Sequence, residues 1–294
     1  GVSSSGGLGV KSGTSMATPM ISAASVLLRE AADRAGVSLT PAEALKVLRD
    51  SGVSVIDGDD ENDNVPNTFQ SYMRVDLLAA LNLLEWQAAG SVPKVVGRHV
   101  FYNDSNFDGS DAAANVDDDN AIALNNEALL PGETVTPANY TSYSRGINGI
   151  MLDIYGLAGT PAPMAGDFDV RVNNMDSGTW SLGPAPEVSL RSHVDGYDRV
   201  TLSWADGEIR NCWLEVTVKS DANGGSLGLA ADDVFYFANV VGDADGDGEV
   251  GISDFATLFG QFGRIGSSLA SDFNSDGRVD LADFMIMRAN FGNT

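Results

Sequence analysis

Residues 243–294 contain an internal repeat, and this repeat constrains the fold more than any other feature of the chain. Each copy has acidic or amide side chains at alternate positions, then a glycine, then apolar residues at fixed places. The repeated residues of the first copy are Asp243, Asp245, Asp247, Gly248, Val250, Ile252, Asp254, Phe255, Phe262 and Gly263. Their counterparts, 29 positions later (272 − 243), are Asp272, Asn274, Asp276, Gly277, Val279, Leu281, Asp283, Phe284, Phe291 and Gly292. Such regularity indicates two copies of one structural unit.

The polar positions of the repeat have the spacing of EF-hand-type calcium loops. A loop of 12 residues supplies oxygen ligands from positions 1, 3, 5, 7, 9 and 12, with a glycine at position 6 for the sharp turn. The predicted ligands of the first loop are Asp243, Asp245, Asp247, the main-chain carbonyl of Glu249, and Asp254. Those of the second loop are Asp272, Asn274, Asp276, the main-chain carbonyl of Arg278, Asp280 and Asp283. The alternative is a pair of metal-free acidic turns, whose carboxylates would repel one another, so we predict two bound calcium ions.

Position 12 of each loop is an aspartate where an EF-hand has a glutamate, and one predicted helix follows each loop. With these features, residues 243–294 resemble a type I dockerin. The resemblance implies docking onto a cohesin module of a scaffold or cell-surface protein. It also implies that loop positions 10 and 11 help to choose the cohesin. These positions are Ile252-Ser253 and Leu281-Ala282, which differ from the Ser/Thr pair of the best-known cellulosomal dockerins. From the apolar residues of the repeat we expect a small shared core, made of Val250, Ile252, Phe255, Leu258, Phe259, Phe262, Val279, Leu281, Phe284, Met287 and Phe291.

A second motif lies near the beginning of the chain, where residues 13–19 read GTSMATP before a helical pattern. Ser15 would lie at the helix N-terminus, where its own N–H and the helix dipole could stabilise a developing oxyanion. Gly13 would let the backbone approach a substrate carbonyl, and Pro19 is close enough to the helix start to be tolerated. The plainer alternative is an ordinary helix capped by Ser or Thr.

The motif resembles the serine signature of subtilisin-like (S8 family) serine proteases, and the resemblance covers about residues 1–88. It implies that Ser15 is the nucleophile of a serine endopeptidase. Thr40, Pro41 and Glu43 predict the capped start of a following helix, with Leu45 and Leu48 as its buried stripe. The family order is Asp, His, Ser, so the base and its partner should precede Ser15. His99 and His193 both follow it. We therefore expect the natural N-terminus to lie upstream of Gly1, and this chain alone to be inactive.

Residues 91–242 have short β-rich runs separated by turn residues, which predicts an antiparallel sandwich. The predicted strands are Val95–Tyr102, Gly149–Tyr155, Asp167–Val172, Asp198–Trp204, Cys212–Lys219 and Val234–Asn239. Residues 98–240 resemble an uncharacterised β domain that precedes dockerins in large secreted bacterial proteins; the matching segments are 98–103, 140–149 and 233–237. Trp180, Trp204 and Trp213 could stack on sugar rings, although core packing is the usual role of tryptophans in strands.

Two further acidic loops are weaker metal candidates. Residues 104–109, from Asp104 to Asp108 and Gly109, repeat the first half of a calcium loop, but position 12 is Asn115. We consider this a third, irregular calcium site. The loop from Asp57 to Asp63 is more simply a solvated turn.

Charge restricts the partners of the chain. Its 17 basic and 41 acidic residues give a net charge of −24, so nucleic acids and anionic membranes would be repelled. No apolar run is long enough to span a bilayer, and no signal peptide is visible. The single cysteine, Cys212, lies in a predicted strand and is expected to be a buried structural thiol.

The sequence thus predicts a multidomain chain. Residues 1–90 would be the α-helical C-terminal part of a subtilase α/β domain, residues 91–242 an antiparallel β-sandwich of unknown function, and residues 243–294 a small α-helical dockerin with paired calcium loops. The resemblances imply a secreted or cell-surface-attached endopeptidase that acts on protein or peptide substrates and docks through its dockerin. The alternative is a non-catalytic extracellular binding or anchoring protein, as part of a polysaccharide-degrading assembly.

Overall fold

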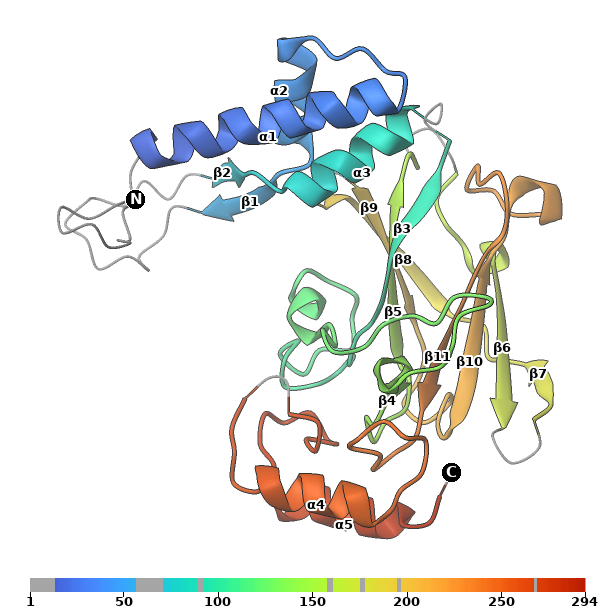
Figure 1. Ribbon diagram of the computed structural model, residues 1–294. Helices are drawn as coiled ribbons and strands as arrows, with labels where there is room; N and C mark the ends of the chain where they lie inside the picture. Colours follow the sequence, from blue (N-terminus) through green and yellow to red (C-terminus); the bar gives the residue numbers. More distant parts are fainter. Residues whose placement is uncertain are drawn as a thin grey trace, which may run out of the picture. The chain divides into compact units, whose positions relative to one another are not determined.

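The structure of the protein is a computed structural model that describes residues 14–56, 71–88, 92–157, 161–174, 178–194, 197–266 and 269–293 (Figure 1). The chain divides into two compact units. The first holds residues 1–92 together with 193–197, and the second holds residues 93–192 and 198–294. Helices and strands occur together, with five α-helices and two larger sheets in the described part, so the chain is a mixed α and β protein. The predicted boundaries at residues 90 and 242 stay predictions.

The first unit contains three helices and one short hairpin. They are α1 (Thr14–Arg34), α2 (Pro41–Asp50) and α3 (Leu77–Ala88), with β1 (Val53–Ile56) paired to β2 (Ser71–Arg74). Helix α2 begins with the predicted capping box. The Thr40 hydroxyl accepts from the Glu43 N–H at 3.3 Å, and Glu43 Oε2 accepts from the Thr40 N–H at 2.8 Å. Pro41 follows at a position where a helix needs no N–H donor.

The helices of the first unit share a small core. Its buried residues are Ala24, Leu28, Ala32, Ala44, Val47, Leu48, Ala80, Leu83 and Leu84. The prediction that Leu45 is buried beside Leu48 was wrong, because Leu45 is 58% exposed. The buried face of α2 is made by Ala44, Val47 and Leu48, which repeat at helical spacing and leave Leu45 on the opposite side.

The second unit contains two sheets that share one core. The first sheet has the order β4 (Tyr140–Thr141), β11 (Asp233–Asn239), β10 (Cys212–Val218), β6 (Phe168–Asn174) and β7 (Trp180–Leu182). The second has the order β3 (Lys94–Val100), β5 (Gly149–Tyr155), β9 (Tyr197–Ser203) and β8 (Glu187–Val194). Every described register is antiparallel except the short parallel pairing of β4 with β11. Alternate residues of both sheets meet in the core, including Ile150, Leu152, Val200, Leu202, Leu214, Val216, Phe235 and Phe237.

All six strands predicted from β-rich runs form, as β3, β5, β6, β9, β10 and β11. Three described strands of the second unit were not predicted: β4 and β7 are very short, and β8 mixes charged and apolar residues. Trp204 is buried in the core, and its indole N–H donates to the Pro184 carbonyl at 3.0 Å. Cys212 is buried as expected, and burial raises the pKa of its thiol to about 11.

The described residues after 242 belong to the second unit and share a small core with Val240 and Tyr140. Helices α4 (Ile252–Gln261) and α5 (Leu281–Asn290) follow the two acidic loops, and the rings of Phe255 and Phe284 bring them into contact. The buried core here consists of Val240, Val250, Leu258, Phe273, Val279 and Met287. The expected core was therefore partly wrong, since Ile252, Phe255, Phe259, Phe262, Leu281 and Phe291 are exposed. Phe273, which belongs to a loop and was not expected in the core, is fully buried in this cluster.

Candidate calcium site

The first acidic loop is organised around two buried aspartates at its ends. Asp243, at position 1, accepts from the Gly246 N–H at 2.7 Å through Oδ1 and from the Gly248 N–H at 2.9 Å through Oδ2. Asp254, at position 12, is fully buried at the start of α4. Its Oδ1 accepts from the Asp245 N–H at 3.1 Å and its Oδ2 from the Gly251 N–H at 2.7 Å. The two carboxylates hold the loop closed from both ends.

The second loop repeats this arrangement. Asp272 accepts from the Asp276 N–H at 3.1 Å and from the Gly277 N–H at 2.9 Å. Asp283, fully buried at the start of α5, accepts from the Phe273 N–H at 2.8 Å and from the Asp280 N–H at 2.9 Å. The repeat of the sequence is therefore also a repeat of hydrogen-bonding geometry.

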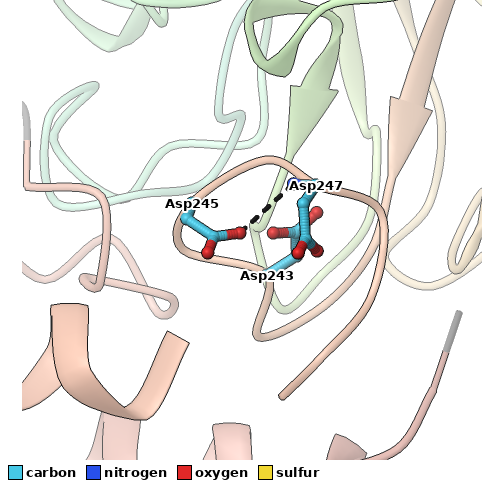
Figure 2. Close-up of side chains that lie close together, drawn as sticks. All are labelled: Asp243, Asp245 and Asp247. Atoms are coloured by element: carbon cyan, nitrogen blue, oxygen red, sulfur yellow. Dashed lines mark hydrogen bonds between the residues drawn. The ribbon is translucent and has the colours of Figure 1, made fainter. Parts of the chain in front are cut away.

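Three carboxylates of the first loop gather around one point. Figure 2 shows Asp243, Asp245 and Asp247 close together within the turn of the loop. One ligand oxygen from each lies within 4.8 Å of those of the other two, and no other group of three or more His, Cys, Asp or Glu side chains in the described chain does the same. Carboxylate oxygens are ligands that hard divalent cations prefer, so this cluster could hold a metal ion.

Electrostatics shows how much negative charge the loops gather. Burial raises the pKa of Asp243 to about 7, against hydrogen bonds from Gly248 and Gly246, and the charges of Asp254 and Asp245 raise it further. The pKa of Asp272 is likewise raised to about 7, first by burial. A bound divalent cation would compensate both the burial of these carboxylates and the repulsion from their acidic neighbours. The donor set is all oxygen, which fits calcium better than a transition metal.

The remaining predicted ligands of the second loop have local roles in the structure. Asn274 Nδ2 donates to Asp276 Oδ2 at 3.0 Å, so these two side chains lie beside each other. Asp280 Oδ1 accepts from the Ala282 N–H at 2.7 Å and thereby caps α5. The N–H groups of Glu249 and Arg278 donate to Asp247 and Asp276 at 2.9 and 3.0 Å, which places their backbones beside the cluster. Direct ligation by Asp280 and by the two carbonyls stays a prediction.

Sequence reasoning missed how the first loop rests on the sheets. Gly246 has a φ of +75°, and a Cβ there would lie 2.7 Å from Pro137 Cβ and 2.8 Å from its carbonyl oxygen. Its counterpart in the second loop is Ser275, which has a φ of +53°. The sequence signal for this contact is Gly246, because the first loop has a second glycine at this position and the second loop has a serine.

The predicted nucleophile Ser15 is the second residue of α1, and its side chain lies outside the described atoms, as does Gly13. Its catalytic role stays a prediction. His99 lies on β3, in the other unit from Ser15, with its Nε2 3.1 Å from Asp153 Oδ2. The side chain of His193 and the Asp57–Asp63 loop also lie outside the described residues.

In the part of the chain that the structure describes, no helix combines the length and apolar character needed to cross a bilayer. Comparison of the chain with protein-family models, curated proteins and solved structures gave no significant match.

Proposed function

We propose that residues 243–294 are a calcium-binding docking module of the type I dockerin kind, carried on a β-sandwich formed by residues 91–242. The observation that supports this most strongly is the shared geometry of the two loops. Each loop has buried aspartates at positions 1 and 12 that accept hydrogen bonds from the loop backbone. Two calcium ions would complete both loops and fix the helices that follow them.

The helices offer a surface on which a partner could dock. Exposed apolar side chains of α4 and α5, and of the residues just after them, are Ile252, Phe255, Phe259, Phe262, Leu281, Met285 and Phe291. Several occupy equivalent positions in the two repeats, such as Ile252 with Leu281 and Phe262 with Phe291. Exposed apolar patches of this kind commonly mark interaction sites. The sequence resemblance suggests that the partner is a cohesin module.

Calcium binding is tested on the full chain by isothermal titration. Asp247→Ala and Asp276→Ala should each remove one bound ion, whereas Asp169→Ala, at an exposed side chain of β6 outside the acidic loops, should remove none. Magnesium should compete poorly because it requires a tight octahedron. If neither loop variant changes the number of ions bound, the loops are not calcium sites.

Docking is tested with immobilised type I cohesin modules in calcium and in EDTA. Binding should require calcium and should weaken at least tenfold in Phe259→Ser. Equal capture in EDTA would argue against a calcium-dependent dockerin.

The parent protein is, in this proposal, a secreted serine endopeptidase in which Ser15 is the nucleophile. The support is the GTSMATP sequence at residues 13–19, together with a helix that begins at Thr14. A serine at a helix N-terminus can use its own N–H to stabilise the oxyanion of acyl transfer. A histidine base and its aspartate partner would have to come from upstream sequence.

The enzyme proposal is tested with a fluorophosphonate probe. The 294-residue chain should not be labelled, because Ser15 without a base is an ordinary alcohol. The upstream-extended protein should be labelled, and Ser15→Ala should abolish that labelling. An extended protein that carries no histidine base and resists labelling would favour the non-catalytic anchoring function.

A further inference from the structure

The segment that follows β3 and includes the 3-10 turn η1 (Asp117–Ala121) carries two carboxylates that lie outside the two acidic loops. Asp108 is 1% exposed and Asp118 is fully buried. The loop is tightly folded, because Asp104, Gly109 and Ser110 all have positive φ angles. Burying an aspartate is costly unless its charge is compensated.

In Asp108, Asp118 and the neighbouring Asn103, one polar atom of the side chain forms a hydrogen bond and the other has no hydrogen-bond partner. Asp108 Oδ1 accepts from the Ser110 N–H at 3.0 Å, and Asp118 Oδ2 accepts from the Asn115 N–H at 2.9 Å. Asn103 Nδ2 donates to the Ala112 carbonyl at 3.4 Å. Five buried side-chain oxygens of the described chain have no hydrogen-bond partner, and three of them are Asn103 Oδ1, Asp108 Oδ2 and Asp118 Oδ1. Native proteins rarely leave such atoms unpaired, and an ion or water is the usual explanation.

The nearby arginines form their ion pairs with other carboxylates, and Arg191 also acts on Asp118, lowering its pKa through its charge. Arg145 pairs with Asp104 and Asp206, while Arg191 and Arg199 both pair with Asp119. Burial raises the pKa of both Asp108 and Asp118, and the charge of Asp108 contributes to the shift at Asp118, so the two carboxylates interact. A shared cation would offset both the burial cost and this repulsion, which water alone would not do.

We propose that the 103–118 loop binds a third calcium ion through Asn103 Oδ1, Asp108 Oδ2 and Asp118 Oδ1. The all-oxygen donor set, with one neutral and two charged ligands, suits this hard cation. The site differs from the one considered from sequence. Asp104 is paired with Arg145, and the side chain of Asn115 donates to Asp111 Oδ2 at 3.0 Å, so neither belongs to the ligand set. Asp118 and Asn103 lie outside the half-motif that drew attention to the loop.

The loop also supports the second calcium loop of residues 272–283. The Asn106 N–H donates to the Ser275 carbonyl at 3.1 Å, and a Cβ at Gly277 would lie 3.6 Å from Asn106 Nδ2. A cation that fixes the 103–118 loop would therefore fix the surface on which the second loop rests. Loss of the third ion should weaken calcium binding at the second loop more than at the first.

The test is the number of calcium ions bound per full chain after equilibrium dialysis, measured by mass spectrometry of the metal. The unmodified chain should hold three ions, and Asp108→Asn or Asp118→Asn should hold two. Asp104→Asn, in the same loop but outside the ligand set, should keep three. A chain with both Asp247→Ala and Asp276→Ala should keep one ion, and adding Asp108→Asn should remove it.

The outcomes separate this site from the two acidic loops. An unmodified chain with two ions, both kept in Asp108→Asn, overturns the third site and leaves the dockerin proposal intact. A chain with one ion that Asp108→Asn removes supports the third site while the dockerin loops fail. Terbium soaked into crystals of the unmodified protein gives an answer that needs no variant. An anomalous peak beside Asp108 and Asp118 is expected, and occupied acidic loops without that peak would overturn the site.

Discussion

Asp153 shows how one buried carboxylate can be kept ionised by its neighbours. It lies on β5 and is 3% exposed. Arg199 donates to both of its oxygens, at 2.7 and 3.0 Å, and His99 Nε2 lies 3.1 Å from Oδ2. Burial by itself would raise the pKa of Asp153, but the hydrogen bonds from His99 and Arg199 outweigh it, and the pKa is lowered. A carboxylate held in this way makes the stability of the fold depend on pH, whereas the proposed calcium loops would make it depend on calcium.

The lowered pKa of Asp153 predicts an acid-sensitive contribution to stability. Because the folded pKa lies below the unfolded value of about 3.9, the contribution is present above that pH and is lost as pH falls through the folded pKa. Asp153→Asn should lower the free energy of unfolding by about 1.5–3 kcal/mol at pH 7, since Arg199 loses the carboxylate that accepts two of its hydrogen bonds but keeps its ion pair with Asp119. It should also reduce the pH dependence below pH 4. Urea unfolding of the full chain, in EDTA and over a pH series, measures both, with exposed Asp169→Asn as the control. Equal pH slopes for wild type and Asp153→Asn would contradict the assignment.

Two glycines of the calcium segment should respond to alanine in opposite directions. Gly246 combines a left-handed φ with a close approach to Pro137, so Gly246→Ala should distort the first loop and cost more than about 1 kcal/mol. Gly260 lies inside α4 with open space around its Cβ position, so Gly260→Ala should add about 0.5–1 kcal/mol. Thermal unfolding in calcium measures the sign of the stability change in each variant. Calcium titration should show weaker binding at the first loop in Gly246→Ala and unchanged binding in Gly260→Ala. A stabilised Gly246→Ala would mean that Pro137 does not constrain the loop.

At the scale of elements, α4 and α5 divide their apolar residues between two faces. Leu258 of α4 and Met287 of α5 point into the core beside Phe273, whereas Ile252, Phe259 and Leu281 face outward. The loops before the helices set this division, because Asp254 and Asp283 anchor the first turn of each helix to its loop. The outward faces are thereby free to contact a partner.

Neighbouring residues of α4 provide a matched pair for this division. Leu258→Ala should destabilise the second unit by about 2–5 kcal/mol, because it removes a fully buried side chain. Phe259→Ala should change stability by less than about 0.5 kcal/mol, because the ring is 74% exposed. Chemical unfolding of the full chain in excess calcium measures both. Equal losses would show that Phe259 is part of the core, as the sequence pattern had suggested.

At the scale of the whole molecule, the calcium segment and the sheets belong to one compact unit. The Ser144 N–H donates to the Phe273 carbonyl at 2.7 Å, and Tyr140 packs against the buried core of the segment. Ordering of the calcium loops should therefore reach the sheets. The segment is therefore joined to the rest of the second unit by a hydrogen bond and by side-chain packing, as well as by the peptide chain.

Calcium should consequently stabilise residues 93–294 together. A ligand that binds only the folded form adds about 2.7 kcal/mol per site at roughly 100 times its dissociation constant. In calorimetry of the full chain, residues 93–294 should unfold in a single transition. Calcium should raise the temperature of that transition, and EDTA should lower it again. Limited proteolysis in calcium should leave a fragment that begins near residue 93, and cleavage in EDTA should start within residues 243–294. A fragment lacking that segment but equally stable in calcium and EDTA would show that the segment is independent.

Features that depend on near neighbours along the chain follow directly from the order of the amino acids. Thr40 and Glu43 form their capping box because they are three residues apart at a helix start. The two loops share one geometry because their aspartates and glycines have the same spacing, and the six β-rich runs form strands because their alternation lies within each run.

Long-range packing in the folded chain selects which apolar residues of the repeat are buried. It also places the carboxylates of Asp108 and Asp118, which lie outside the two acidic loops. Phe255 and Phe259 are exposed, whereas Phe273 is buried in a core against which Tyr140 packs, more than a hundred residues away in sequence. The charge of Asp108 acts on Asp118, ten residues further along the chain, because the chain folds back between them. Periodicity records the faces of a helix but not what packs on each of them, since packing is a long-range property of the folded chain.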